Sequence, residues 1–217
     1  MLRTALTKHP DIYISNEIFH PDFSSDEIVA GGLSSIFSHW FENAPDKKIK
    51  MAIIHLTHAK PADTMTQGTD CYKIWNMIYN NPSIKVVMLR RASYLRRYVS
   101  HLIAGETGVY VTYNESDRVQ QKVVIDPIAY FENIIRTDQL YSETLANLQD
   151  HQLKLCIYES MLGNFSKTCS EIFSFLNLPD VNVTPDTIKR EIRSMENVVE
   201  NYQELKKFFI NHPYALY

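Results

Sequence analysis

Two adjacent arginines follow an apolar run in the middle of the chain. Residues 84–89 read IKVVML, Arg90 and Arg91 come next, and Ser100 lies nine residues after Arg91. An apolar run rich in β-branched residues is typical of a buried strand in a parallel sheet. Arginine suits phosphate because its planar guanidinium donates paired hydrogen bonds and keeps its charge, and a nearby hydroxyl can complete the set of donors. Since ligands of open α/β sheets bind at the carboxyl ends of strands, this spacing predicts an anion site there.

The same segment carries two further arginines, Arg96 and Arg97, on the helix expected after the strand. A run of charges is usually a solvated face, and this interpretation accounts for Arg96 and Arg97. It accounts poorly for Arg90 and Arg91, because charges at the end of a buried parallel strand lie where a cleft is expected. The anion site is therefore assigned to the pair at the strand end.

The elements that must position these residues alternate between strands and helices along the chain. Apolar runs of strand length stand at 11–14, 49–56, 84–89 and 153–158, and helical patterns mark 1–8, 25–43, 69–79, 94–104, 127–148, 165–176 and 187–209. Residues 105–122 are polar and irregular, which is typical of a loop. The alternation predicts a single α/β domain over residues 1–217, with a parallel sheet flanked by helices on both faces.

Composition argues against several classes of partner. The 217 residues carry a formal net charge of -3, so there is no overall basic footprint for nucleic acid or for an anionic membrane. No apolar run approaches the roughly 18 residues of a membrane span, and the first ten residues lack the apolar stretch of a signal peptide. We therefore expect a soluble, cytoplasmic protein without a nucleic-acid partner. The sequence gives no indication of its oligomeric state.

Cysteine and histidine are not spaced as metal ligands. Cys71, Cys156 and Cys169 are widely separated and form no C-x-x-C pattern, which predicts reduced thiols in or near the core. His55 and His58 have no third ligand nearby, so they are interpreted as core or cleft histidines. We expect no metal site.

The stretch LRRASYLRRYVSH, residues 89–101, resembles a motif of sulfotransferases that use 3'-phosphoadenosine-5'-phosphosulfate (PAPS), in the form found in bacterial and phage-encoded members. In that family an Arg after a buried strand, and a Ser eight or nine residues later, hold the 3'-phosphate of PAPS. The resemblance implies that Arg91 and Ser100 hold this phosphate here, with Arg90 as the alternative to Arg91. Ser93 stands where the family usually has Asn.

Six other stretches fall in the order that this family would have them, namely MLRTALTKHP, SNEIF, KMAIIHL, LCIYESM, IFSFLNLP and NYQEL. The second of these resembles a loop with an active-site Glu, which implies Glu17 as the general base, with His20 as the rival base. Lys50, at the start of an expected strand, is a candidate for contacting the sulfate or the departing phosphate, and a surface lysine is the alternative. Glu159, at the end of the 153–158 strand, is expected to accept hydrogen bonds from loop amides.

The resemblance implies a P-loop-type sulfotransferase fold that lacks its first strand and loop. The family's first strand and its loop of the type P-x-S-G-T/S-T/S are expected immediately before Met1. That loop wraps backbone N–H groups and a helix N-terminus around the 5'-phosphosulfate. A misassigned start, a shortened chain or a protein that binds nucleotide without catalysis would each account for this. We expect the 217 residues to bind the desulfated product and to transfer sulfuryl groups very slowly or not at all.

The function implied by the resemblance is transfer of a sulfuryl group from PAPS to a hydroxyl or amine of a small-molecule or saccharide acceptor, without a metal. One alternative is a non-catalytic nucleotide-binding remnant of such an enzyme. Another is a P-loop-type nucleotide kinase, which would need a Walker-type lysine and magnesium carboxylates, and the sequence shows neither. Acceptor specificity is expected in residues 20–35 and 105–122, whose sequences do not identify the acceptor.

Overall fold

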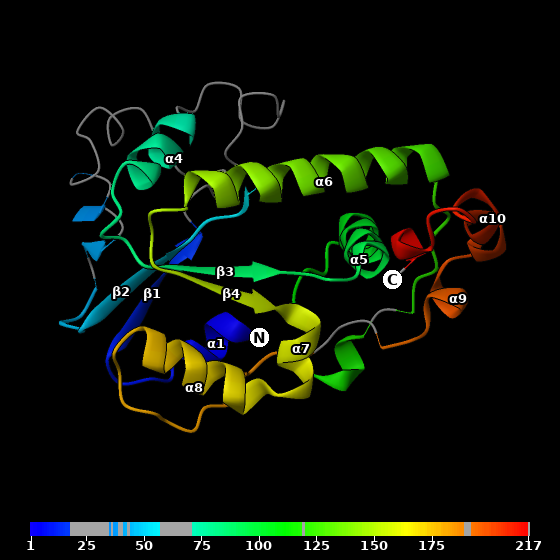
Figure 1. The fold of residues 1–217 in the computed structure, drawn as a ribbon. Helices are drawn as coiled ribbons and strands as arrows, with labels where there is room; N and C mark the ends of the chain where they lie inside the picture. Colours follow the sequence, from blue (N-terminus) through cyan, green and yellow to red (C-terminus); the bar gives the residue numbers. More distant parts are fainter. Residues whose placement is uncertain are drawn as a thin grey trace.

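The fold is an α/β arrangement in which helices surround two pairs of parallel strands (Figure 1). The computed structural model describes residues 1–17, 35, 37–38, 41–42, 44–56, 71–118, 120–188 and 192–216. Its elements in chain order are α1 (Leu2–Leu6), β1 (Ile12–Glu17), β2 (Ile49–Ile53), α4 (Cys71–Tyr79), β3 (Val86–Arg90), α5 (Tyr94–Thr107), η3 (Glu115–Asp117), α6 (Pro127–Asn147), β4 (Leu153–Ile157), α7 (Tyr158–Gly163), α8 (Phe165–Phe175), α9 (Met195–Val198), α10 (Tyr202–Phe208) and η4 (Pro213–Leu216).

The strands form two parallel pairs within the described ranges. β1 pairs with β2, and β3 pairs with β4 in a register that ends at Arg90 opposite Ile157. The strands lie where the sequence predicts them, so the parallel α/β prediction is confirmed. Several strand boundaries differ from the prediction by one to three residues; at the carboxyl ends of the second pair, Arg90 is the last residue of β3 and Tyr158 already begins α7. The strand expected before Met1 and the single-domain assignment stay predictions.

Helices cover both faces of the β3–β4 pair, as the sequence predicts. α6 lies along one face, and α1 and α8 lie on the other (Figure 1). One core cluster joins Met88 of β3 to Leu148 beyond the end of α6. A second joins Cys156 of β4 to Leu6 of α1 and Phe173 of α8. Because side chains alternate along a strand, consecutive residues of β3 point toward different layers.

Local capping explains where the two helices next to the site begin. The Ser93 hydroxyl accepts a hydrogen bond from the Arg96 N–H at 3.2 Å and caps α5, which starts at Tyr94, four residues after the last residue of β3. The Asp126 carboxylate accepts one from the Ile128 N–H at 2.8 Å and caps α6 in the same way. α5 ends at Thr107 and is capped by Gly108, whose φ of 68° lies in the left-handed region that favours glycine.

The sequence predicts one helix over residues 187–209, and this prediction is wrong. Two short helices, α9 and α10, replace it, and the intervening Val199 is extended and forms a parallel bridge with Val123. The side chain of Asn201 reinforces this bridge, because its amide accepts from the Ile125 N–H at 3.0 Å and donates to the Ile125 carbonyl at 2.8 Å. Hydrogen bonding to the 123–125 segment therefore outweighs helix continuity.

The C-terminal helices complete a third core cluster beyond the carboxyl ends of β3 and β4. Leu95 and Ile103 of α5, Tyr130 of α6, Leu205 of α10 and the following Phe209 are buried together there. Their burial anchors α5, the helix that carries Ser100, against α6 and the tail. The helix expected over 25–43 falls mainly outside the described residues.

Candidate anion-binding site

The β3–β4 register brings Arg91 beside Tyr158. Arg90 and Ile157 are the last paired residues, so the next residue of each chain segment emerges at the same edge. The Arg91 guanidinium carbon lies 4.3 Å from the centroid of the Tyr158 ring, a cation–π contact. The Tyr158 hydroxyl also lies 3.8 Å from the sulfur of Met1, which brings the start of α1 to the same place.

Arg91 and Ser100 line one cleft of about 190 Å³ at the carboxyl end of β3. Tyr158, Arg96 and Met1 line it as well. The structure thus brings together the arginine and the serine that the sequence paired on spacing. Arg91 is partly shielded, with 23% of its side chain exposed, so an anion in the cleft would meet a cation that is only weakly screened by water.

Arg90 lies on the other face of the strand pair, away from this cleft. One of its terminal nitrogens lies 3.0 Å from the Tyr94 hydroxyl and 3.3 Å from a carboxylate oxygen of Asp138 on α6. Its guanidinium carbon also lies 4.9 Å from the centroid of the Tyr141 ring. The sequence left Arg90 open as an alternative to Arg91, and the lining of the cleft includes Arg91 alone of the two.

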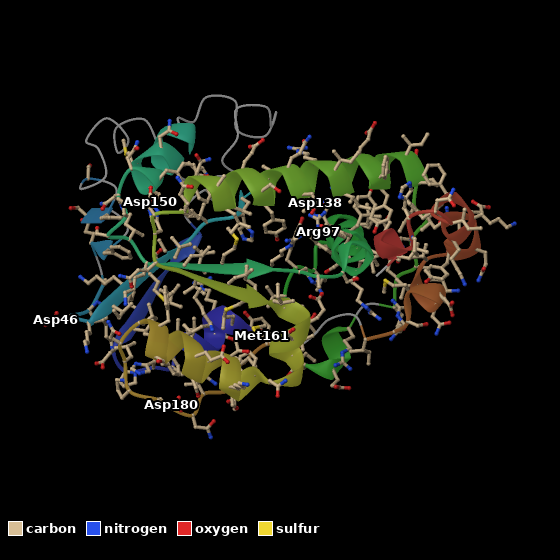
Figure 2. All side chains as sticks on the ribbon, in the orientation of Figure 1. Asp46, Arg97, Asp138, Asp150, Met161 and Asp180 are labelled. Atoms are coloured by element: carbon tan, nitrogen blue, oxygen red, sulfur yellow. The ribbon has the colours of Figure 1, made fainter. Side chains whose placement is uncertain are left out.

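Arg97 does not belong to a solvated face, contrary to the sequence interpretation. It points from α5 toward α6 and donates to the side chains of Asn133 and Thr137, the latter at 2.6 Å (Figure 2). Desolvation by burial lowers the pKa of this guanidinium. Arg96 is not simply solvated either, since it lines the cleft and donates to the Arg193 carbonyl at 3.2 Å.

The remaining predicted site residues fall elsewhere. Lys50 is an exposed residue of β2, paired with Tyr13 of β1, and it is not among the residues that line the cleft. Glu17 is the last residue of β1, and its side chain lies outside the described part of the structure. His20 lies outside the described residues altogether. The two candidate bases therefore stay predictions.

The cleft lining also has a less charged part, which includes Thr112 of the 105–122 loop that the sequence assigned to acceptor specificity. Thr112 and Thr187 line it, and their side-chain oxygens are buried without a hydrogen-bond partner, with 2% and 5% of each residue exposed. The Ile188 N–H donates to the Thr112 carbonyl at 2.9 Å and joins the two segments. Tyr110 stands at the rim and is 70% exposed. The sequence did not point to Thr187, because its segment is irregular and lies far from residue 112 in the chain, so no periodic signal joins the two.

Glu159 forms a second side-chain contact with Arg91. One of its carboxylate oxygens accepts from the Ala92 N–H at 2.7 Å, which confirms the expected contact with a loop amide. Its other oxygen lies 3.6 Å from Nε of Arg91.

Burial raises the pKa of Tyr158, and Arg91 partly opposes this shift, so the phenol is neutral near pH 7.

The described residues hold neither a metal-binding cluster nor a membrane-spanning helix. Within the part of the chain that the structure describes, no group of three or more His, Cys, Asp or Glu side chains could hold a metal ion. None of the described helices is both long and apolar enough to cross a membrane.

Comparisons with known proteins point to one fold. No family model matches the chain. Nodulation protein H of Rhizobium meliloti, strain 1021, is 24% identical over 137 residues, which is 62% of this chain and 56% of the relative, so the match spans little more than half of that protein. The crystal structure of a sulfotransferase from Alicyclobacillus acidocaldarius superposes with a TM-score of 0.51 at 16% identity, covering 99% of this chain and 87% of that one. The chain therefore has the fold of a sulfotransferase.

Proposed function

We propose that this chain is a sulfotransferase that uses PAPS as the sulfuryl donor and binds the donor's 3'-phosphate with Arg91 and Ser100. The observation that carries the proposal is that both residues line one cleft at the carboxyl end of β3. A terminal pair of guanidinium N–H groups fits two oxygens of a phosphate, and a serine hydroxyl supplies a further donor. The sulfotransferase fold and the order of the sequence motifs support the same assignment.

The uneven chemistry of the cleft supports a nucleotide as the ligand. Its lining combines two guanidiniums, Arg91 and Arg96, with the hydroxyls of Thr112 and Thr187 beside Ile188. A ligand that contacts both kinds of group needs an anionic group joined to a neutral part with hydrogen-bonding edges. Adenosine with a 3'-phosphate has both parts, so it matches the cleft better than inorganic phosphate does.

In the proposed reaction an acceptor hydroxyl or amine attacks the sulfur of PAPS in line with the departing oxygen. The bond from the acceptor to sulfur forms, the bond from sulfur to the 5'-phosphate oxygen breaks, and the acceptor proton passes to a base. We propose Glu17 as that base, since it ends β1, with His20 as the rival. Lys50 is the candidate for neutralising charge on the departing phosphate, and the acceptor is a small molecule or saccharide.

Calorimetry with two nucleotides tests the binding part of the proposal. Adenosine 3',5'-bisphosphate carries the phosphate assigned to Arg91 and Ser100, and adenosine 5'-monophosphate lacks it. We expect the bisphosphate to bind at least tenfold more tightly, the effect of about one charge-assisted hydrogen bond or more. Equal affinities would contradict the assignment of the 3'-phosphate to this cleft.

Transfer assays with radiolabelled PAPS and a panel of hydroxyl and amine acceptors test the catalytic part. Glu17→Gln is expected to lower kcat by roughly 10²–10⁴ while the affinity for the bisphosphate is unchanged. A rate that survives this change but is lost in His20→Ala would move the role to His20. Nucleotide binding with no transfer to any acceptor, also in a form extended upstream of Met1, would favour a non-catalytic nucleotide-binding protein.

A further inference from the structure

We propose that Glu159 is a positioning residue, which orients the Arg91 guanidinium so that its terminal nitrogens face the phosphate in the cleft. This inference rests on the proposed function, because it concerns the residue to which the 3'-phosphate is assigned. It adds a residue that touches neither the donor nor the acceptor and acts only through Arg91.

The first support is the way that α7 follows β4. Tyr158 and Glu159 open α7 directly after the last residue of β4, and Arg91 and Ala92 directly follow the last residue of β3. Because these two strands are paired in parallel, the two short segments lie against each other. Tyr158 contacts Arg91, and Glu159 contacts both Arg91 and Ala92.

The second support is that Tyr158 and Glu159 contact different parts of the Arg91 guanidinium. The Tyr158 ring covers one face of the Arg91 guanidinium, with 4.3 Å from the ring centroid to its central carbon. A Glu159 carboxylate oxygen lies 3.6 Å from Nε, on the edge nearest the chain. The terminal edge, with its paired N–H groups, is the edge left for a ligand, and paired N–H groups are what arginine uses to bind phosphate.

The third support is a pair of polar atoms that have no other partner. Arg91 Nε and one oxygen of Glu159 are both buried without a hydrogen bond, and they face each other just beyond hydrogen-bond distance. The other Glu159 oxygen is already fixed by the Ala92 N–H. A small shift of the arginine side chain would complete an Nε–H to carboxylate bond. We infer that phosphate bound at the terminal nitrogens selects the arginine conformation that makes this bond.

A carboxylate close to an anion site has two opposite effects on affinity. Its negative charge repels the phosphate. Its contact with Arg91, however, restricts the arginine side chain before binding and so reduces the conformational entropy that is lost when phosphate binds. We expect positioning to prevail, because Glu159 meets the guanidinium on the edge turned away from the ligand. The sign of the change in affinity on removing the charge therefore tests the proposal directly.

The experiment compares Glu159→Gln with wild-type protein by calorimetry at low salt. Gln keeps the size of Glu and an oxygen for the Ala92 N–H, but it removes the charge that attracts Arg91. We expect the variant to bind adenosine 3',5'-bisphosphate about tenfold more weakly, and adenosine 5'-monophosphate within about twofold of wild type. Glu171→Gln is the matched control, because Glu171 forms an ion pair with Lys154 outside the cleft and its loss is expected to leave both affinities unchanged.

Three results would decide against the proposal. Unchanged or tighter binding of the bisphosphate by Glu159→Gln would show that the carboxylate only repels the ligand. Equal weakening of both nucleotides would show a general structural role. If wild-type protein binds the two nucleotides equally, the proposed function itself fails, whatever the variant does.

A measurement on wild-type protein keeps the test valid even if the variant does not fold. The Nε–H resonance of Arg91 can be followed by ¹H–¹⁵N spectroscopy and assigned with Arg91→Lys, which lacks that group. We expect it to move downfield when adenosine 3',5'-bisphosphate is added, because the hydrogen bond to Glu159 forms, and to stay unchanged with the monophosphate. A resonance that does not respond to the bisphosphate would overturn the proposal.

Discussion

Arg90 and Arg91 are neighbours in sequence, yet the protein surrounds them in opposite ways. On the α6 face, Arg90 has an ion pair with Asp138, a bond to Tyr94 and a ring contact with Tyr141. On the cleft face, Arg91 has a ring contact and a carboxylate at 3.6 Å, and its Nε is buried without a hydrogen bond. Both arginines have a carboxylate within 4 Å, but Arg90 is hydrogen-bonded to its carboxylate, whereas Nε of Arg91 is not.

The difference suggests how one strand end can serve both stability and binding. A salt bridge with hydrogen bonds joins β3 to α6, and such partly exposed pairs stabilise a fold by a modest amount. A cation with unused donors at the edge of a cleft can instead bind an anion. Alternation of side chains along the strand separates the two roles by a single residue.

The largest expected effect comes from removing each arginine in turn. Arg91→Ala should weaken binding of adenosine 3',5'-bisphosphate roughly 100-fold, because two charge-assisted hydrogen bonds are lost. Arg90→Ala should leave that affinity within about twofold and lower the free energy of unfolding instead. Calorimetry and urea unfolding of both variants check the contrast. A larger loss of affinity in Arg90→Ala would reverse the two roles.

A smaller effect is expected from the serine that shares the cleft with Arg91. Ser100→Ala should weaken binding of the bisphosphate about tenfold, since one hydroxyl donor to a charged group is removed. Ser93→Ala is the matched control, because Ser93 caps α5 and is not among the residues that line the cleft. It should lower stability by about 1 kcal/mol and leave affinity unchanged. Equal losses of affinity would mean that helix integrity, and not the Ser100 hydroxyl, matters.

The rings beneath the two arginines give a still smaller contrast. Tyr158→Leu should weaken binding of the bisphosphate about three- to fivefold, because the cation–π contact that steadies Arg91 is lost. Tyr141→Leu removes the corresponding ring under Arg90, together with a hydrogen bond between the Tyr141 hydroxyl and the Arg91 backbone, and should weaken binding less than Tyr158→Leu does. Calorimetry on the two variants distinguishes them, and Tyr158→Phe should behave as wild type. Loss of affinity in Tyr158→Phe would instead assign a role to the hydroxyl.

The smallest expected effect concerns the α6 face and depends on pH. Burial, followed by the hydrogen bond to Asp138, raises the pKa of Tyr94 above its ordinary value of 10.0, with Arg90 opposing the shift. The folded protein thus retains the Tyr94 proton more strongly than the unfolded chain does. Its stabilisation is fully present below pH 10 and is lost as pH rises through the raised folded-state pKa.

Tyr94→Phe should therefore lower the free energy of unfolding by about 0.5 kcal/mol at pH 8, and this difference should shrink above pH 10. Urea unfolding at pH 8, 9, 10 and 10.5 measures it. The affinity for the bisphosphate at pH 8 should not change, because Tyr94 contacts Arg90 and not Arg91. A difference in stability that grows with pH would mean that the sign of the shift is wrong.

The sequence was sufficient to pair Arg91 with Ser100, but not to exclude Arg90. The apolar run locates the strand, and the helical pattern that follows it places Ser100 on the next helix. Both the strand and the helix are therefore indicated by local patterns in the sequence. The choice between the arginines depends on how β3 pairs with β4 at its carboxyl end. A shift of this pairing by one residue would exchange the faces of the sheet on which Arg90 and Arg91 lie. The run suggested an end at residue 89, whereas the strand continues through Arg90. Strand boundaries are set by pairing with β4, which no local pattern records.

Other parts of the site depend on contacts between distant segments. Thr112 reaches the cleft because its carbonyl accepts the Ile188 N–H, a contact between residues more than seventy positions apart in the chain. The broken C-terminal helix has a similar cause, since Val199 pairs with Val123. Helix propensity favoured continuity there, and a tertiary hydrogen bond overrode it.

The amide of Asn201, which bonds to both backbone groups of Ile125, has a consequence for the order in which the protein acquires its structure. The contact closes a chain loop of 76 residues, and such long-range contacts form slowly and late in folding. During synthesis on the ribosome, α5 and α6 emerge well before Leu205 and Phe209 arrive to bury their shared surface. The helix that carries Ser100 should therefore lack its final support until the last of these residues has been made. A nascent chain stalled before Asn201 should be open to proteolysis around α5.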